Sequence, residues 1–162
     1  MRIFVDADAF PNVVRDVLIR ASARRNVPLC FVANKPLRGG GSANISFIQV
    51  PAGPDVADDH IAGLVEAGDL VITADIPLAD RVIAKGAFAL DPRGKLYTQD
   101  NIKNSLAIRD LLKELRDLEM IGGGPATFGK KERQAFADQL DRILTRQLKA
   151  ELNVHKAELN GH

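Results

Sequence analysis

The chain has 162 residues, of which 46% are hydrophobic and 27% charged, and its formal net charge is +1. This is the length of one ordinary domain with enough apolar residues for a core, and no global charge draws it towards nucleic acid or a membrane surface. The single cysteine, Cys30, excludes a disulfide within the chain and a thiolate zinc cluster, and no apolar run is long enough to span a bilayer.

Short apolar runs and helical patterns alternate through the first half of the chain, which is typical of a parallel sheet with crossover helices. The expected elements are strand Arg2–Asp6, helix Pro11–Asn26, strand Pro28–Ala33, strand Ile45–Val50, helix Asp55–Ala67, strand Leu70–Thr73, helix Ile76–Lys85 and strand Phe88–Leu90. Two amphipathic helices follow, over Asp100–Asp117 and Lys130–Leu148. The sequence thus predicts an α/β fold with a mainly parallel sheet of about five strands and extra C-terminal helices.

We expect residues 1–150 to form a single domain and the polar residues 151–162 to form a flexible C-terminal tail. The first residues lack the basic and then apolar stretch of a secretion signal. We therefore expect a soluble cytoplasmic protein that makes no membrane contact.

Charge is segregated along the chain. Between Arg15 and Arg38 there are six basic residues and one acidic residue, whereas Gly39–Asp80 contains no lysine or arginine. A basic flank next to an acidic centre suits a phosphodiester substrate, because the flank would hold phosphates while the carboxylates hold a cation. The alternative is that the arginines of this flank only form the solvated face of a helix.

Two carboxylates, Asp6 and Asp8, follow the first apolar run directly, before a proline at position 11 that can open a helix. In α/β folds, ligands bind just beyond the carboxyl ends of the strands. An unpaired charge is not tolerated within a buried strand, but a strand end that faces a cation can carry one. The two residues therefore predict a metal site or phosphate chemistry at this edge of the sheet.

Further acidic residues fall where this topology would bring them to the same edge. Their positions are after the fourth strand, in the helix that follows it and on one face of the second helix: Asp75, Asp80, Asp55, Asp58 and Asp59. If the first and fourth strands are neighbours, as in the order 3-2-1-4-5, their carboxyl ends meet at a topological switch point. Converging carboxylates raise one another's pKa unless a divalent cation neutralises them, and oxygen-only ligands favour Mg²⁺ or Mn²⁺ over zinc.

Each of these acids also has a purely structural interpretation. Asp55 would cap the second helix, and Asp75 would cap the helix that begins at Ile76. Asp58 and Asp59 would favour the first turn of their helix through its dipole. Asp80 would pair with a neighbouring base, Arg81 or Lys85.

Basic residues near the glycine-rich stretches are candidates for binding backbone phosphates. They are Lys35, Arg38, Lys130 and Lys131. The segment Gly122–Gly124 lies shortly before a predicted helix, whose first amides would suit an anion. Neither glycine-rich stretch has the Gly-Lys-Ser/Thr ending of a Walker loop, and both also suit ordinary connections. With one tyrosine and no tryptophan, a stacking platform for single strands is not favoured.

Four ordered motifs, VDADAFP at 5–11, PDVADDHI at 54–61, DLVITADIPLAD at 69–80 and GGGP at 122–125, resemble those of the YaiI/YqxD family of uncharacterised bacterial proteins. The resemblance covers residues 1–148. That family in turn looks like a branch of the PIN/NYN-like nucleases, which implies a three-layer α/β/α fold. It also implies clustered acids that hold Mg²⁺ or Mn²⁺ and cut RNA, or sometimes DNA.

Carried over by motif, Asp6 matches the acid after the first strand, Asp58 or Asp59 the acid on the second helix, and Asp75 the acid after the Val-Ile-Thr strand, with Asp80 as a fourth. The nuclease step is an analogy at the level of the fold. One departure is Phe10, where the family usually has a cysteine. A nucleophilic or redox role for that position is therefore excluded here.

The sequence thus predicts a Mg²⁺- or Mn²⁺-dependent nuclease that favours RNA over DNA. Asp6, Asp58 or Asp59, and Asp75 would ligate the ion, and Asp8 and Asp80 would be further ligands or orient water. One alternative is a haloacid-dehalogenase-like phosphatase, in which Asp6 would be the nucleophile and Lys85 the required lysine. Its expected acidic pair after the lysine is missing from the sequence. The other alternative is an RNA-binding module without catalysis.

Overall fold

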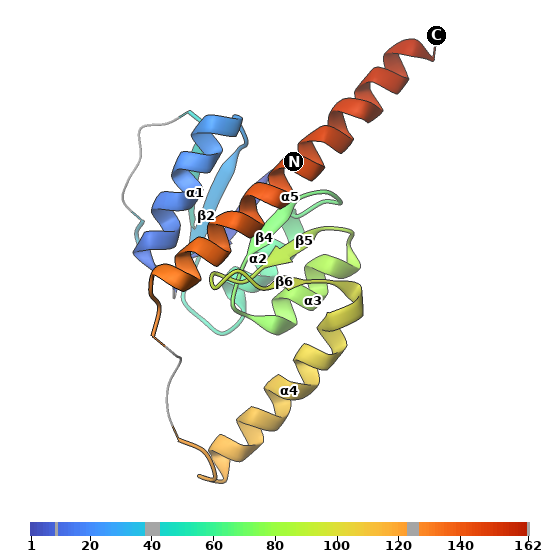
Figure 1. The fold of residues 1–162 in the computed structure, drawn as a ribbon. Helices are drawn as coiled ribbons and strands as arrows, with labels where there is room; N and C mark the ends of the chain where they lie inside the picture. Colours follow the sequence, from blue (N-terminus) through green and yellow to red (C-terminus); the bar gives the residue numbers. More distant parts are fainter. Residues whose placement is uncertain (9, 38–42, 123–126, 162) are drawn as a thin grey trace.

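A six-stranded sheet in the order β3-β2-β1-β4-β5-β6 lies at the centre of the computed structural model, which describes residues 1–8, 10–37, 43–122 and 127–161 (Figure 1). Its strands are β1 Ile3–Asp6, β2 Leu29–Ala33, β3 Ile45–Gln49, β4 Leu70–Ile72, β5 Phe88–Leu90 and β6 Leu96–Tyr97. The first five pair in parallel, and β6 runs antiparallel to β5. The predicted class, the mainly parallel sheet and the order of its first five strands are confirmed.

Helices cover both faces of this sheet. They are α1 Asn12–Arg25, α2 Val56–Leu64, α3 Ile76–Ala84, α4 Gln99–Asp117 and α5 Lys130–Asn160. Because side chains alternate along a strand, Ile3 and Val5 of β1 join the core under α1 and α5, whereas Phe4 joins the core under α2, α3 and the start of α4. Two apolar cores on opposite faces make three layers, α/β/α.

The predicted element bounds differ from the observed ones mainly near the second and last helices. Helix α2 ends at Leu64 rather than Ala67, because Val65 turns to an extended conformation and is buried. Helix α5 continues to Asn160 rather than ending at Leu148. Residues 149–160 contain neither glycine nor proline and are rich in alanine, leucine, glutamate and lysine, so no residue there ends the helix.

Strand β6 belongs to a hairpin that the sequence analysis did not predict. Asp91 donates its amide to the Lys95 carbonyl at 2.9 Å, and the Gly94 amide donates to the Asp91 carbonyl at 2.9 Å. Asp-Pro-Arg-Gly is a turn sequence, with proline at the second position and glycine at the fourth. This signal was present, but β6 has only two residues and therefore shows no alternating pattern.

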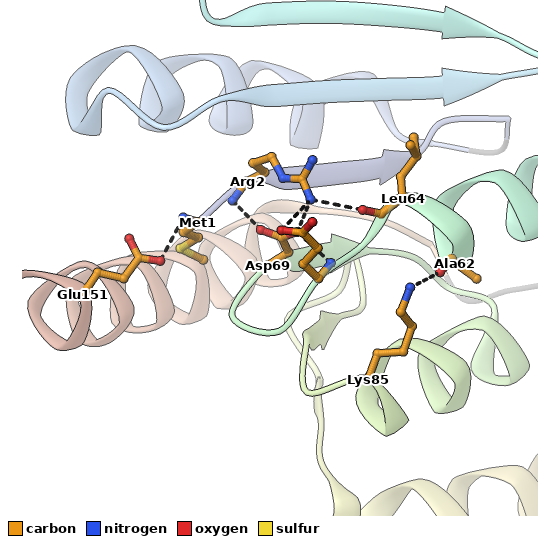
Figure 2. A network of polar contacts seen from close by, with 8 residues as sticks. Met1, Arg2, Ala62, Leu64, Asp69, Lys85 and Glu151 are labelled. Atoms are coloured by element: carbon orange, nitrogen blue, oxygen red, sulfur yellow. Dashed lines mark hydrogen bonds and ion pairs between the residues drawn. The ribbon is translucent and has the colours of Figure 1, made fainter. Parts of the chain in front are cut away.

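A buried carboxylate fastens β1 to β4 at the amino end of the sheet (Figure 2). Asp69 is 4% exposed and accepts from the Arg2 amide at 2.9 Å, from the Arg2 guanidinium at 2.8 Å and from the Glu66 amide at 2.9 Å. The same guanidinium donates to the Leu64 carbonyl at 3.0 Å. These bonds fix the relative position of the two strands whose opposite ends carry the acidic residues.

In the part of the chain that the structure describes, no helix is both long enough and apolar enough to cross a membrane.

Candidate functional site

The neighbouring strands β1 and β4 bring two of the predicted acids to one edge of the sheet. Asp6 is the last residue of β1, and Val5 lies beside Ile72, the last residue of β4. Asp75 follows as the N-cap of α3, where its carboxylate accepts from the Leu78 amide at 2.9 Å. The chain continues from β1 to β2 on one side and reaches β4 on the other, so this edge is the switch point of the sheet.

A buried hydroxyl links these two acids. Thr73 is 1% exposed, and its Oγ1 donates to Asp6 Oδ2 at 3.0 Å and accepts from the Asp75 amide at 2.9 Å. Thr73 was not predicted to be part of a metal site. The signal was a hydroxyl at the end of an apolar run, two residues before an acid, where its side chain points into the same edge.

Asp58 joins them from α2, which packs beside β1. Burial raises the pKa of Asp58 to about 7, together with the negative charges of Asp75 and Asp6, a hydrogen bond between the carboxyls of Asp58 and Asp75, and the charge of Asp55. Burial likewise raises the pKa of Asp6, the Thr73 hydroxyl lowers it, and the charges of Asp75 and Asp8 raise it. We refer to Asp6, Asp58 and Asp75 as the acidic cluster.

The other predicted acids have partners of their own. Asp8 accepts from the Asn34 amide at 2.9 Å and so connects the loop after β1 to the loop after β2. Asp59 lies 2.7 Å from the Arg81 guanidinium, and Asp80 lies 3.4 Å from the Lys103 ammonium on α4 rather than pairing with Arg81 or Lys85.

Of the two predicted helix caps, Asp75 makes the expected hydrogen bond. Asp55 occupies the N-cap position of α2 with a left-handed φ of 62°, and its side chain makes no capping hydrogen bond. Asp55 is exposed and acts on Asp58 through its charge. Asp58 and Asp59, which the sequence left as alternatives for the acid on this helix, point in different directions. Asp58 faces Asp6 and Asp75, and Asp59 faces Arg81.

The predicted phosphate-binding residues lie on separate segments of the chain. Lys35 is exposed on the segment after β2, and Lys130 and Lys131 are exposed in the first turn of α5. Arg38 lies outside the described residues. At the start of α5, the Gly129 amide already donates to the Glu132 carboxylate at 2.9 Å, so an acidic side chain of the chain itself occupies that donor.

Part of the basic flank serves the packing of α1. The Arg15 guanidinium lies 5.4 Å from the centre of the Phe31 ring and 5.8 Å from that of Phe47. Arg25 donates to Asp141 at 2.7 Å and to Thr145 at 2.6 Å, which joins α1 to α5. Arg20 and Arg24 are exposed, as the alternative of a solvated helix face expects.

Phe10, the residue in place of the family's usual cysteine, is half-buried and packs against the core under α1 and α5. Lys85, which the phosphatase alternative requires, caps the C-terminal end of α3 and donates to the Ala62 carbonyl at 2.6 Å (Figure 2). Lys85 lies at the opposite end of α3 from Asp75, and its ammonium is bonded to a backbone carbonyl of α2 rather than to a carboxylate of the acidic cluster.

The acidic cluster has donors for a cation but does not enclose one. Among the described residues, no three carboxylate, imidazole or thiolate side chains are gathered closely enough to hold a metal ion as they stand. Burial and the charges of Asp75 and Asp6 instead raise the pKa of Asp58 to about 7, which favours a proton where these carboxyls approach one another. A proton held between repelling oxygens is what a divalent cation would replace, and an all-oxygen donor set suits Mg²⁺ or Mn²⁺.

Comparisons with known proteins place the chain in a family. A family model described as "Uncharacterized BCR, YaiI/YqxD family" matches residues 4–146. A UPF0178 protein of Trichlorobacter lovleyi is 53% identical over 92% of this chain and 97% of the relative, and one of Bordetella avium is 56% identical over 91% and 96%. No solved structure matches the chain significantly. The sequence resemblance is thereby confirmed: the chain belongs to the YaiI/YqxD family.

Proposed function

We propose that this chain is a Mg²⁺- or Mn²⁺-dependent nuclease that hydrolyses phosphodiester bonds, with RNA favoured over DNA. The observation that carries the proposal is the acidic cluster: Asp6 at the end of β1, Asp75 at the N-cap of α3 and Asp58 on α2 lie at the switch point of the sheet, where the pKa of Asp58 is raised to about 7. Groups with strongly shifted pKa values at such an edge are typical of functional sites.

Asp6, Asp58 and Asp75 would hold the cation. When bound, a divalent cation in such a site polarises the phosphoryl group and supplies a nucleophilic water at neutral pH. The Thr73 hydroxyl keeps Asp6 oriented, and the cap on Leu78 keeps Asp75 at the N-terminus of α3. Asp8 is placed at the margin by the Asn34 amide, where its carboxylate would orient water.

The preference for RNA rests on the resemblance to PIN/NYN-like nucleases, with which the three-layer α/β/α fold is compatible. Exposed Lys35, Lys130 and Lys131 would contact the phosphate backbone without selecting a sequence. Because the net charge is only +1, binding would depend on these local contacts rather than on the field of the whole molecule.

The test is cleavage of single- and double-stranded RNA and DNA in the presence of Mn²⁺, Mg²⁺ or EDTA. The chain offers a matched pair of variants on one helix. Asp58→Asn removes a member of the acidic cluster, whereas Asp59→Asn removes an exposed carboxylate that pairs with Arg81. We expect metal-dependent cutting of RNA that falls by at least about 10²-fold in Asp58→Asn and Asp75→Asn and stays within about threefold in Asp59→Asn.

Metal binding gives a readout that does not depend on choosing the right substrate. Titration calorimetry with Mn²⁺ should show binding by the wild type and by Asp59→Asn, and weak or no binding by Asp58→Asn. Equal Mn²⁺ affinity in all three proteins would reject the site. RNA retention without cleavage, unchanged in Asp75→Asn, would instead support a binding module.

A further inference from the structure

The parallel strands of the sheet end at one common edge, which we call the carboxyl edge. Along it the strands follow in the order β2, β1, β4 and β5. The acidic cluster lies in the middle of this row, at the end of β1 and shortly after β4. Basic side chains lie at the carboxyl edge on both sides of the cluster, and their positions bear on the course that a substrate strand takes over the site.

Lys35 lies on the β2 side of the cluster. Asp6 is paired in register with Val32 of β2, so Lys35 follows three residues beyond the level of Asp6. The Asn34 amide donates to Asp8 at 2.9 Å and thereby holds this segment beside the loop after β1. Lys35 is exposed, and its backbone lies at most about 11 Å from that of Val32. Its long side chain is therefore placed to hold a phosphate beside one bound at the cluster.

Lys130 and Lys131 lie on the β5 side of the cluster. The hairpin that follows β5 packs on the first turns of α5, where a Cβ on Gly94 would lie 2.7 Å from the carbonyl carbon of Ala135. Figure 1 shows the start of α5 at the same end of the body as the start of α1, which follows β1. Both lysines are exposed in the first turn of α5. They are thus at the carboxyl edge, on the opposite side of the cluster from Lys35.

The separation of these two sides suits a nucleic acid strand. Neighbouring strands of a sheet are about 4.8 Å apart, so β2 and β5, with β1 and β4 between them, are separated by about 14 Å. One strand of a duplex has a phosphate about every 3.4 Å along the axis, so this span takes up to about four phosphates. A phosphate at the acidic cluster then has neighbours within reach of lysines on either side.

The other courses across the cluster are less favourable for a polyanion. Residues 39–80, which include all of α2, contain no lysine or arginine, and Asp55 is exposed at the start of that helix. A phosphate backbone laid over α2 would therefore meet negative charge. A course over α1 would pass Arg20 and Arg24, which are exposed in the second half of that helix, away from the carboxyl edge. These two arginines distinguish that course from one along the edge.

We propose that the substrate strand lies along the carboxyl edge of the sheet, with Lys35 holding its phosphates on one side of the acidic cluster and Lys130 and Lys131 holding them on the other. This inference rests on the proposed nuclease function and adds the course of the RNA strand. Because the strand is held on both sides of the reacting phosphate, the bond that is hydrolysed is internal. The oxygen of a water bonds to phosphorus, one ester oxygen leaves with a proton from that water, and two shorter strands result.

The salt dependence of RNA binding tests the course of the strand. Binding of a short labelled single-stranded RNA is followed by fluorescence anisotropy in EDTA, so that the readout does not depend on cleavage. The slope of log affinity against log salt should become shallower by about 0.7 for Lys35→Gln and by up to about 1.4 for Lys130→Gln/Lys131→Gln, since each phosphate contact of a single strand contributes about 0.7. The matched control Arg20→Gln/Arg24→Gln removes two exposed cations from α1 and should leave the slope unchanged.

Two results of this experiment would overturn the inference. An unchanged slope in either lysine variant would mean that the strand is not held on that side of the acidic cluster. A slope that becomes as shallow in Arg20→Gln/Arg24→Gln as in the lysine variants would place the strand over α1 instead of along the carboxyl edge.

A circular single-stranded RNA, compared with linear RNA of the same sequence, tests the kind of bond that is cut. Both forms should be cut in Mn²⁺ at comparable rates, because the site needs no free end, and Asp58→Asn should cut neither. A circle that stays intact while the linear form is shortened from one end would reject this inference and leave the nuclease function standing. A wild type that cuts neither form would reject the nuclease function, and the internal cut with it, whereas the salt slopes decide the course of the strand independently.

Discussion

At the scale of single residues, Thr73 is the centre of the candidate site. Its buried hydroxyl uses its one proton on Asp6 and accepts from the amide that precedes the capping carboxylate of α3. One side chain thus connects two acids, Asp6 at the end of β1 and Asp75 at the N-cap of α3. The hydroxyl also opposes the rise in the pKa of Asp6 that burial causes.

Thr73→Val should therefore destabilise the fold, because it keeps the shape of the side chain while leaving a buried carboxylate and a backbone amide without this partner. We expect a loss of about 1–3 kcal/mol in the free energy of unfolding. Thr73→Ser keeps the hydroxyl and is the control, with a loss of about 1 kcal/mol or less for one buried methyl group. Urea unfolding of the three proteins measures the difference, and equal stability of wild type and Thr73→Val would contradict this role.

Asp58 makes the stability depend on pH in a defined direction. Its folded pKa of about 7 lies above the ordinary value of 3.8, so the folded chain holds this proton more tightly than the unfolded chain does. The stability that comes from the proton is present in full below pH 3.8 and is lost as the pH rises through 7.

Asp58→Asn should consequently match the wild type at low pH and become more stable than it as the pH rises through neutrality. Because this side chain is only half-buried, screening by solvent limits the effect to on the order of 1 kcal/mol. Thermal melts between pH 4 and pH 9 with EDTA measure it. The stability of Asp59→Asn, which lacks an exposed ion-paired acid, should change with pH as that of the wild type does. A stability difference between Asp58→Asn and the wild type that does not change with pH would refute the raised pKa of Asp58.

At the scale of elements, the hairpin of β5 and β6 is held against α5 by a glycine. Gly94 has φ +96°, and a Cβ there would lie 2.7 Å from the carbonyl carbon of Ala135 and 2.9 Å from its oxygen. The neighbouring atoms belong to the backbone of a helix and do not move easily. Gly94 thus sets both the turn and the distance between the hairpin and α5.

Gly94→Ala should destabilise the protein by more than about 1 kcal/mol, because a left-handed conformation and a backbone clash act together. The contrasting variant is Gly63→Ala, which lies in α2 with nothing within 4 Å of the new methyl group. Alanine there should raise the stability by a few tenths to about 1 kcal/mol, since it is the better helix former. Chemical denaturation compares the two, and effects of the same sign would contradict the structure at one of these positions.

At the scale of the whole molecule, two helices extend beyond the three-layer body. The second half of α4 is one of them, and the end of α5 is the other (Figure 1). Beyond Ala150 the side chains of α5 are mostly exposed, including Leu152 at 52%, Val154 at 58% and Leu159 at 66%. The N-terminal ammonium lies 2.8 Å from Glu151 and forms an ion pair that joins this extension to the body.

A chain that ends at residue 150 should therefore fold cooperatively, as the predicted domain bounds require. The lost ion pair has one partner that is 41% exposed, and pairs of this kind contribute about 0–1 kcal/mol. At about 2–4 °C per kcal/mol for a chain of this size, the melting temperature should fall by only a few degrees. Thermal melts followed by circular dichroism compare both chains, and loss of the cooperative transition would place the boundary further along α5.

Most of the fold was predictable from the sequence because its signals are local. Apolar runs such as Leu70–Ile72 and the helical spacing of α1 indicate their elements without reference to the rest of the chain. The hairpin strand β6 was missed because two residues carry no pattern, and the end of α5 was misplaced because residues 149–160 contain no glycine or proline that would stop a helix.

The sequence by itself determined that acids follow the first and fourth strands, because strand ends and their charged neighbours are adjacent along the chain. It did not determine which acids meet. Asp58 and Asp59 are adjacent on α2, yet one faces Asp6 and Asp75 and the other faces Arg81, and Asp80 pairs with Lys103 on a helix far along the chain. Only the packing of α2, α3 and α4 on the sheet decides these directions, because they depend on the rotation of each helix about its own axis.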